Sequence, residues 1–362
     1  MLFFNLSAFY FFYFAAVAVY IIFMPKVLHD IGYTPSQIGV VFALAPLMRF
    51  ATPFLFLKHI KLNATIFKSS LLLSILSAIG FYFTLNNFYA FTLNNALLGI
   101  CLSLILPYIE VIALKELGKD RYGKSRLYGS IGFMFIALVL AKFLSEPQIA
   151  LHYYLCVTIL IVIFSLLLLK HDVPHEDTIS SKPFSVLEYW PFWLSLFFMQ
   201  MSFGGFYNFF TIYETENGIS LEMTSYLWSF GVICEIVMFY FQAPFFKNNL
   251  LSIIKISIFV TAIRWFLLYL FPDNLYITFF AQSIHAFSFG LYHSAVIIYL
   301  YKIYENKKLA QQFMYGVAYG LGGFVGALVA GWLYGENLFL YSALFALASL
   351  LFVSIMKEDV SK

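Results

Sequence analysis

Charged residues are scarce in this chain. Aspartate, glutamate, lysine and arginine make up 11% of its 362 residues, whereas a soluble domain carries about 25%. Hydrophobic residues make up 62%, and apolar runs of bilayer length recur from end to end. This composition excludes an ordinary soluble domain and predicts an all-α membrane protein with many spans.

Cysteine is also rare, and the usual sequence signatures of catalytic and metal sites are missing. The three cysteines, Cys101, Cys156 and Cys234, lie in apolar stretches without a CxxC motif or metal-ligand spacing, which is typical of small packing residues. A membrane-embedded enzyme, the distant alternative, would need His285 or His293 as its catalytic residue, but no Ser/His/Asp or His/Asp-rich motif accompanies them. We therefore expect no enzyme activity, metal site, cofactor or nucleic-acid partner.

Twelve hydrophobic segments follow one another along the chain, separated by short polar breaks. Each is long enough to cross about 30 Å of hydrocarbon, for which roughly 20 helical residues suffice. The first has no basic stretch before it and no small-residue cleavage site, so we interpret it as a retained helix. The predicted spans are residues 2–24, 36–57, 64–85, 88–115, 125–144, 149–169, 188–213, 222–246, 250–271, 274–302, 309–334 and 337–356.

The positions of lysine and arginine predict the orientation of these spans. Basic residues gather in alternate connections and at the C-terminus, and only Lys26 and Lys142 fall on the opposite side. Because cytoplasmic loops carry the excess of positive charge, both termini are predicted to be cytoplasmic. The longest cytoplasmic connection follows the sixth span, so we predict a six-helix bundle (1–169), a cytoplasmic linker (170–187) and a second six-helix bundle (188–362). Two such bundles are typical of secondary transporters.

Among the charged side chains of the predicted spans, five are candidates for the membrane interior: Arg49, Glu110, Arg126, Glu235 and Arg264. An ionisable group is costly in a bilayer, so it usually faces the interior of a bundle and marks a substrate or ion path. Arg49 could extend to the cytoplasmic side or meet an anionic substrate. Glu235 could couple transport to protons or form a structural ion pair with Arg264.

Polar and small residues form rows at helical spacing in three spans. Such rows indicate a water-lined cavity, with hydrogen bonds between helices as the alternative. Two histidines in one span also favour a binding or proton-transfer role over a simple core position. The rows are Gln200, Gly204, Tyr207, Thr211 and Glu214 with Asn208 beside them, then Trp228, Gly231 and Glu235, then Gln282, His285, Phe289 and Tyr292 with His293 beside them. The glycine pairs Gly316/Gly320 and Gly322/Gly326 of the eleventh span predict close helix packing, with a hinge or gate as the alternative.

The stretch PYIEVIALKELGKDRYGKSRLYGSIGF resembles the hairpin between the fourth and fifth helices of the lactose permease branch of the major facilitator superfamily. Arg126 stands in the pattern [FY]-G-x-x-R-x-[FYW]-G-x-x-G of that branch, and the resemblance implies that Glu110 and Arg126 face each other across the substrate site. Glu235, Arg264 and His285 fall where the permease carries its helix-eight Glu, helix-nine Arg and helix-ten His. The nearer match is the 3-phenylpropionate transporter group, on YLWSFGVICE, QSIHAFSFGLYHSA and YGVAYGLGGFVGALVAGWLYG.

The chain also departs from the permease pattern. Ser288 replaces an acid three residues after the histidine, FGGFYNFF lacks the helix-seven acids, and the loop signature after the second helix is reduced to FLFLKHIKLN. If protons drive transport, Glu235 is the acid left to carry them.

The predicted fold is therefore the major facilitator fold, with twelve transmembrane helices. The predicted function is proton-coupled symport of a small organic solute by alternating access, by a monomer in the bacterial inner membrane. The substrate is expected to be an aromatic carboxylate such as a phenylpropionate-like acid, with an oligosaccharide or nucleoside as the alternative. The predicted substrate-binding residues are Glu110, Arg126, Arg49, Gln200, Tyr207, Asn208, Trp228 and Gln282, and the predicted proton-coupling residues are Glu235, Arg264, His285 and His293.

Overall fold

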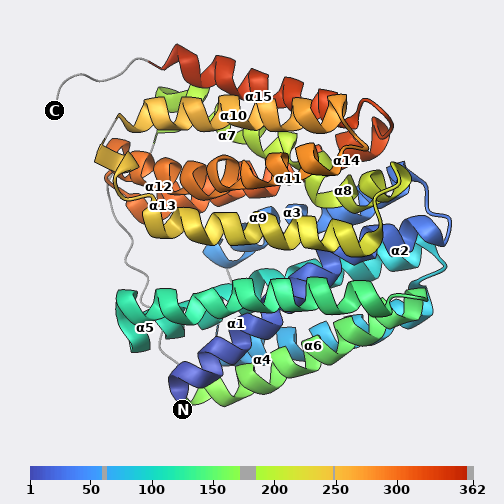
Figure 1. Ribbon diagram of the computed structural model, residues 1–362. Coiled ribbons are helices and arrows are strands. Elements are labelled where there is room, and N and C mark those ends of the chain that lie inside the picture. Colours follow the sequence, from blue (N-terminus) through green and yellow to red (C-terminus); the bar gives the residue numbers. More distant parts are fainter. Residues whose placement is uncertain (59–62, 172–184, 248, 357–362) are drawn as a thin grey trace. The chain divides into compact units, whose positions relative to one another are not determined.

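The computed structural model describes residues 1–58, 63–171, 185–247 and 249–356. Within these ranges every regular element is a helix (Figure 1). The chain divides into two compact units, Met1–Asp177 (unit 1) and Thr178–Lys362 (unit 2). Most of the predicted linker 170–187, and residues 59–62 of the FLFLKHIKLN stretch, lie outside the described residues.

The helices of unit 1 begin where the sequence supplies a cap. The side chain of Asn63 accepts a hydrogen bond from the Ile66 N–H, and Asn87 does the same for Ala90. Pro147 opens another helix, where its fixed φ and missing N–H are tolerated. The elements are α1 (Leu2–Ala18), the π-helical η1 (Val19–Phe23), α2 (Met24–Asp30), α3 (Pro35–Lys58), α4 (Ala64–Thr84), α5 (Phe88–Phe143), α6 (Pro147–Leu168) and η2 (Leu169–His171).

The long helix α5 contains two of the predicted spans. Its backbone leaves helical geometry at Gly118, where φ is 67° and ψ is 171°, a left-handed conformation that glycine adopts at little cost. The candidate spans on either side are Phe88–Gly118 and Arg121–Phe143. Gly118 thus separates the span that carries Glu110 from the span that carries Arg126.

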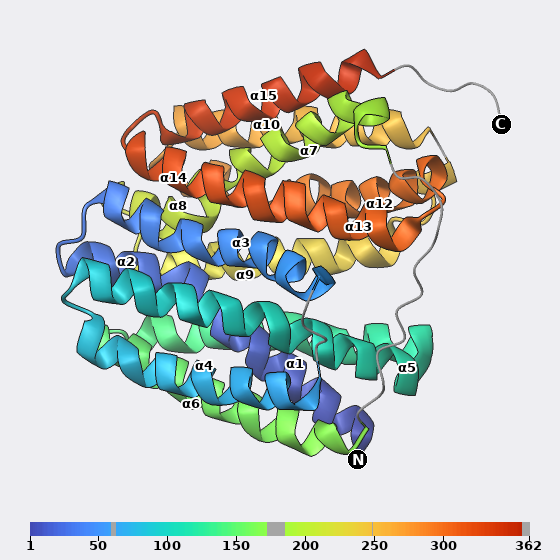
Figure 2. The same ribbon diagram turned by 180° about the vertical axis from the view of Figure 1, so that it is seen from behind.

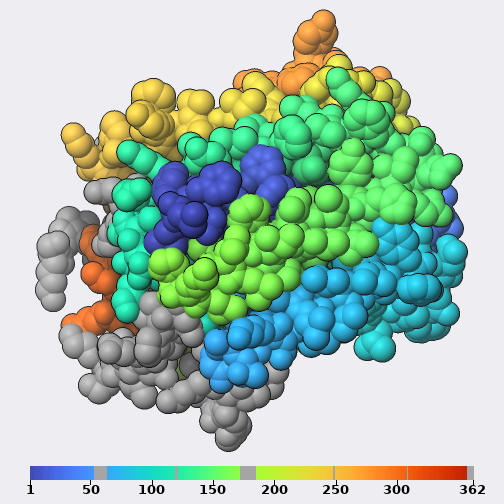
Figure 3. All heavy atoms as spheres, turned by 90° about the horizontal axis from the view of Figure 1, so that it is seen from below, coloured from blue at the N-terminus to red at the C-terminus, as the bar shows by residue number. Residues whose placement is uncertain are grey.

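Glycines allow α1 to approach α5 closely. A Cβ at Gly129 would lie 2.6 Å from the ring of Phe14, and a Cβ at Gly132 would lie 2.0 Å from the carbonyl oxygen of Phe11. Small residues of this kind let two membrane helices meet at backbone distance. Both glycines belong to the sequence pattern around Arg126, so the pattern brings the aromatic side chains of α1 to this arginine. On another side α1 packs against α6, which also packs against α4, and Figure 3 shows α6 between these two helices on one outer face.

Unit 2 has more irregular helices than unit 1. Two of its predicted spans contain π-helical stretches, and one is broken at Phe203. The elements, seen from the other side in Figure 2, are η3 (Leu187–Tyr189), α7 (Trp190–Ser202), α8 (Gly204–Glu216), α9 (Leu221–Phe241), η4 (Phe245–Lys247), α10 (Leu250–Leu270), α11 (Leu275–Ser283), the π-helical η5 (Ala286–Leu291), α12 (Tyr292–Ile303), α13 (Lys307–Met314), the π-helical η6 (Tyr315–Gly322), α14 (Gly323–Trp332) and α15 (Leu338–Ile355).

The break at Phe203 coincides with a close backbone contact. A Cβ at Gly204 would lie 2.2 Å from the carbonyl oxygen of Gly326, and a Cβ at Gly322 would lie 2.7 Å from that of Phe197. The glycine-rich segment therefore packs directly against the backbone of α7 and α8. This contact agrees with the close packing predicted for Gly322 and Gly326.

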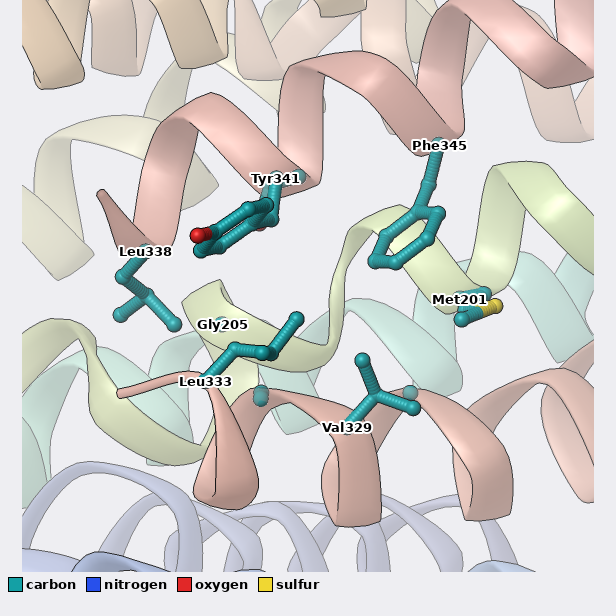
Figure 4. Close-up of a pocket in the computed structure, with 10 residues that line it drawn as sticks. Met201, Gly205, Val329, Leu333, Leu338, Tyr341 and Phe345 are labelled. Carbon is teal, nitrogen blue, oxygen red and sulfur yellow. The ribbon is translucent and has the colours of Figure 1, made fainter. Parts of the chain in front are cut away.

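A small cavity lies beside this break (Figure 4). Its volume is about 10 Å³, which is about the space that one water molecule needs. Its lining is almost entirely apolar, from the α7–α8 junction, α14 and α15, and includes Met201, Val329, Leu333, Leu338 and Phe345. The cavity is thus too small and too apolar to be a solute-binding site in this conformation.

Ten helical stretches among the described residues are long and apolar enough to cross a membrane. They match all the predicted spans except 36–57 and 188–213, which correspond to α3 and to α7 with α8. Each of α7 and α8 has 13 residues, fewer than the roughly 20 that a span needs. A multi-pass, all-helical membrane protein is therefore confirmed, whereas twelve spans and cytoplasmic termini stay predictions.

Replacing Gly132 by alanine should destabilise unit 1. The new Cβ would overlap the Phe11 carbonyl, and such overpacking typically costs about 1–3 kcal/mol. Gly123→Ala is the matched control, because nothing lies within 4 Å of a Cβ there. We expect a lower melting temperature in detergent for Gly132→Ala and no loss for Gly123→Ala. Equal melting temperatures would show that α1 and α5 are not in close contact.

Candidate functional site

The polar cluster of unit 2 is built around Arg264 of α10, which is fully buried. Its Nη2 donates to Oε1 of Gln282 at 2.9 Å, and its Nη1 donates to the Ser288 hydroxyl at 3.3 Å and lies 3.0 Å from Nδ1 of His285. A buried charge is tolerated only when such partners replace water. All three partners come from the α11–η5 segment, so Arg264 ties α10 to this segment.

Two aromatic rings complete the environment of this guanidinium. The Cζ atom of Arg264 lies 4.4 Å from the ring centroid of Phe206 and 4.5 Å from that of Trp265. Ring faces attract a cation, and the attraction is larger when water is excluded. The arginine is therefore held by hydrogen bonds at its two terminal nitrogen atoms and by rings at its plane, whereas Nε has no partner among the described residues.

The contact with Arg264 defines the protonation of His285. Arginine can only donate, so the Nδ1 atom that faces it must accept, and the ring proton of a neutral imidazole then lies on Nε2. This Nε2 lies 3.6 Å from Oε2 of Glu235. A second proton on Nδ1 would oppose the guanidinium. The cluster therefore holds His285 neutral, with its N–H directed at the Glu235 carboxylate.

No ion pair joins Glu235 to Arg264 within the described part of the chain, because His285 lies between them. The Glu235 side chain is 18% exposed, whereas Arg264 is fully buried. Ser288, which stands where the permease pattern has an acid, accepts from Arg264 and donates to the carbonyl of Ile284 at 3.1 Å. Arg264 thus has neutral hydrogen-bond partners, and Glu235 is the acid of this cluster.

A row of stacked rings extends from the cluster along the tenth span. His285 stacks on Phe289 with centroids 5.5 Å apart, and Phe289 stacks on His293 at 5.9 Å, both pairs within 10° of parallel. His293 Nδ1 then lies 2.8 Å from the hydroxyl of Tyr319 in η6. The π-helical turn of η5 adds a residue to the repeat. As a result His293 continues the row, although the sequence pattern placed Tyr292 on that face.

Other substrate-binding residues predicted in unit 2 already make hydrogen bonds or ring contacts within the protein. Trp228 donates its indole N–H to the Thr211 hydroxyl at 3.2 Å, and Asn208 donates to the backbone carbonyl of Gly204 at 2.8 Å. Tyr207 stacks on Phe203 with centroids 5.4 Å apart. Structural hydrogen bonds and packing thus account for much of the polar row that the sequence showed in the seventh span.

Gln200 lies apart from the Arg264 cluster. It lines a second cavity of about 10 Å³ together with Tyr292, His293 and Tyr319. The Tyr292 hydroxyl is buried and has no hydrogen-bond partner in the described structure. This cavity is more polar than the one near Phe203, but it has room only for about one water molecule.

Glu110 and Arg126 form the polar centre of unit 1. Arg126 Nε lies 3.4 Å from Oε1 of Glu110, and the Tyr122 hydroxyl donates to the same oxygen at 3.4 Å. The guanidinium of Arg126 also lies 4.2 Å from the ring centroid of Phe14 and 5.3 Å from that of Tyr10. The side chains of Glu110 and Arg126 are 30% and 34% exposed. The pair is therefore more accessible than the buried cluster of unit 2.

Arg49 does not join this pair. It is an exposed residue of α3, and no hydrogen bond or ion pair links it to another described residue. It lies within electrostatic range of Tyr13 and Tyr20, which are otherwise hydrogen-bonded to the Leu102 carbonyl and to Asn95. Unit 1 therefore contains a compensated arginine, Arg126, and a cation without an anionic partner among the described residues, Arg49.

Sequence reasoning missed the aromatic partners of the arginines and of His293. Phe206, Trp265, Phe14 and Tyr319 gave no signal, because the chain has 45 phenylalanines and 26 tyrosines. Tyr122 could have been found, since it occupies the aromatic position of the pattern that contains Arg126.

The comparisons with known proteins agree with this architecture. A model of the MFS_1 like family matches residues 3–346. The chain belongs to this family. It is also 24% identical to the probable 3-phenylpropionic acid transporter of Escherichia coli (strain K12), over 94% of both chains. The major facilitator resemblance predicted from the sequence is therefore confirmed, and the chain is a multi-pass membrane transporter.

Solved structures show the same fold. The nucleoside transporter NupG superposes with a TM-score of 0.81 at 16% identity, covering 99% of this chain and 100% of that one. An auto inhibited peptide transporter of the POT family superposes with a TM-score of 0.75 at 10% identity, covering 100% and 98%. At these identities the likeness concerns the fold alone.

Replacing Arg264 by lysine should destabilise unit 2, although the charge is kept. A lysine lacks the planar fork that reaches Gln282, His285 and Ser288 together, and buried groups left without partners cost about 1–3 kcal/mol each. We expect a clear fall in melting temperature in detergent. Arg121→Lys is the matched control, because Arg121 is exposed. A melting temperature as high as that of the control would contradict the role assigned to the Arg264 hydrogen bonds.

Proposed function

We propose that this transporter is a proton-coupled symporter of a small aromatic carboxylate, acting as a monomer by alternating access in the bacterial inner membrane. Glu110, Arg126, Arg49, Gln200, Tyr207, Asn208, Trp228 and Gln282 are the proposed substrate-binding residues, with Glu235, Arg264, His285 and His293 in proton coupling. The name of the E. coli relative supports the substrate class, because 3-phenylpropionic acid is an aromatic carboxylic acid.

The unpaired charge of Arg49 carries the substrate proposal. Arg126 is compensated by Glu110, and Arg264 is buried among neutral partners, so neither offers a free charge. Arg49 is exposed on α3, within the predicted span 36–57, and has no carboxylate partner among the described residues. A cation in a membrane segment usually serves a substrate or ion path. An anionic substrate would supply the missing negative charge.

Glu235 is the proposed proton carrier of the polar cluster. It is partly exposed, so a proton can reach it, and its Oε2 lies 3.6 Å from Nε2 of His285. Its protonation would weaken the contact with His285 without disturbing the bonds between His285 and Arg264. A change of charge at a polar cluster can shift the balance between two conformations only if it stabilises one of them more than the other. Proton-dependent contact with His285 supplies such a difference.

A hydroxyl-rich solute, such as an oligosaccharide or a nucleoside, is the second candidate. Glu110, Arg126 and Tyr122 are close together and present both donors and acceptors, and a pair of this kind suits sugar hydroxyl groups. We prefer the aromatic carboxylate, because a neutral hydroxyl-rich solute would not supply an anionic partner for Arg49.

The charge of Arg49 can be tested with 3-phenylpropionate and its neutral amide. If Arg49 binds the carboxylate, Arg49→Gln should weaken binding of the acid about tenfold or more, since a charged hydrogen bond contributes about 1.5–3 kcal/mol. Binding of the amide should change little. Lys68→Gln removes an exposed charge from the same unit and should affect neither ligand. Equal affinities for acid and amide in all three proteins would rule out the carboxylate.

Glu235 can be tested by separating exchange from accumulation. Glu235→Gln mimics the protonated acid, so in vesicles it should still exchange labelled 3-phenylpropionate across the membrane. It should not accumulate this substrate when a proton gradient is imposed. Glu222→Gln is the matched control on the same helix, because Glu222 is exposed and accepts from Tyr226. Proton-driven accumulation by Glu235→Gln would show that another group carries the proton.

A further inference from the structure

Glu214 is a buried acid that the proposed function does not use. It lies in the last turns of α8 and has no exposed surface. Neither of its carboxylate oxygens has a hydrogen-bond partner, and no ion pair includes it, within the described part of the chain. In this respect it differs from the other acids of the spans, because Glu110 is bonded to Arg126 and Tyr122, and Glu235 faces His285.

The position of Glu214 on α8 places it beside α9. It follows Thr211 by three residues, so the two share a side of the helix. Thr211 accepts from the Trp228 indole of α9 at 3.2 Å. One turn before Trp228, Thr224 and Ser225 of α9 are fully buried, and the Ser225 hydroxyl also lacks a partner among the described residues. Polar groups short of hydrogen bonds are thus present on both helices at this level.

No described cation compensates Glu214. The elements that pack against α8 include α7, α9, α14 and α15, of which α7 and α14 carry no titratable side chain. Arg264 of α10 and His285 also contact α8, but at Phe206, two turns before Glu214, and Arg264 donates to Gln282 and Ser288 instead. The other titratable side chains of α10 are Lys255 and Tyr269. Those on α9 and α15 are Glu222, Tyr226, Cys234, Glu235, Tyr240 and Tyr341. On α8 itself, Tyr213 donates to the Leu268 carbonyl and Glu216 accepts from Tyr334. A metal is not indicated either, because no group of three or more His, Cys, Asp or Glu in the described structure could hold one.

A carboxylate in this position would be a buried charge without a partner, which costs several kcal/mol or more. Binding one proton removes that charge and leaves a neutral acid. We propose that Glu214 binds a proton in this conformation and is a second proton-binding acid of unit 2, separate from Glu235. The α8 helix ends two residues later at Glu216, which is exposed. Release of the proton therefore requires a conformation in which water reaches the Glu214 carboxyl group itself, two residues from that exposed end. This inference does not depend on the identity of the substrate or on the role of Glu235.

Infrared spectroscopy of the purified protein at neutral pH can test the proposal, because protonated carboxyl groups absorb apart from carboxylates. The wild-type spectrum should contain a protonated-carboxyl band that Glu214→Gln lacks, corresponding to about one group per chain. Glu216→Gln is the matched control two residues along the same helix, and its spectrum should keep the band. A band of equal size in Glu214→Gln and the wild type would overturn the proposal.

A second measurement uses the unmodified chain, so it does not depend on the folding of a variant. Dicyclohexylcarbodiimide adds to protonated carboxyl groups in apolar surroundings, where the acid proton moves to a carbodiimide nitrogen and the carboxyl oxygen bonds to its carbon. Mass spectrometry should find the adduct on Glu214 and not on Glu216. Labelling of other acids without Glu214 would contradict the proposal. Because no transport is measured, failure of Glu235→Gln to uncouple transport would leave this result unchanged.

Discussion

The guanidinium of Arg264 is the constraint on which the interior of unit 2 depends. A permanent charge that is fully buried needs several donors satisfied at once, and the chain provides Gln282, His285 and Ser288 on one neighbouring segment and two rings on its faces. These contacts also determine which nitrogen of His285 carries the proton. The chemistry available to Glu235 therefore follows from the placement of an arginine that does not touch it.

Arg126 of unit 1 and Arg264 of unit 2 differ in their partners and in their exposure. In unit 1, Arg126 has a carboxylate partner, is about one-third exposed, and is held against α1 by glycines that allow close approach. In unit 2, Arg264 has only neutral hydrogen-bond partners and no exposure. An exposed pair can exchange a partner for a ligand at small cost, whereas a buried cation cannot lose its partners without a large penalty. The exposed pair thus suits binding, and the buried arginine suits the positioning of other groups.

The sequence was sufficient to predict the features that depend on charge and hydrophobic length. It identified the membrane class and most of the spans, because charge is rare and apolar length is conspicuous in such a chain. The resemblance to the lactose permease branch implied that Glu110 faces Arg126. The sequence could not predict the break at Phe203 or the π-helical turns, since these depend on contacts such as the one between Gly204 and Gly326. Next to one of these π-helical turns, His293 rather than Tyr292 continues the row of stacked rings. Glu214 was visible in a polar row, but burial without partners is a property of the packed structure alone.

The hydrogen bond between Arg264 and Nδ1 of His285 gives that histidine a direction. While the bond is intact, Nδ1 is occupied as an acceptor, and Nε2 is the ring nitrogen left to face another residue, Glu235 of α9. The arginine thus turns two similar ring nitrogens into a one-way connection from α10 to α9.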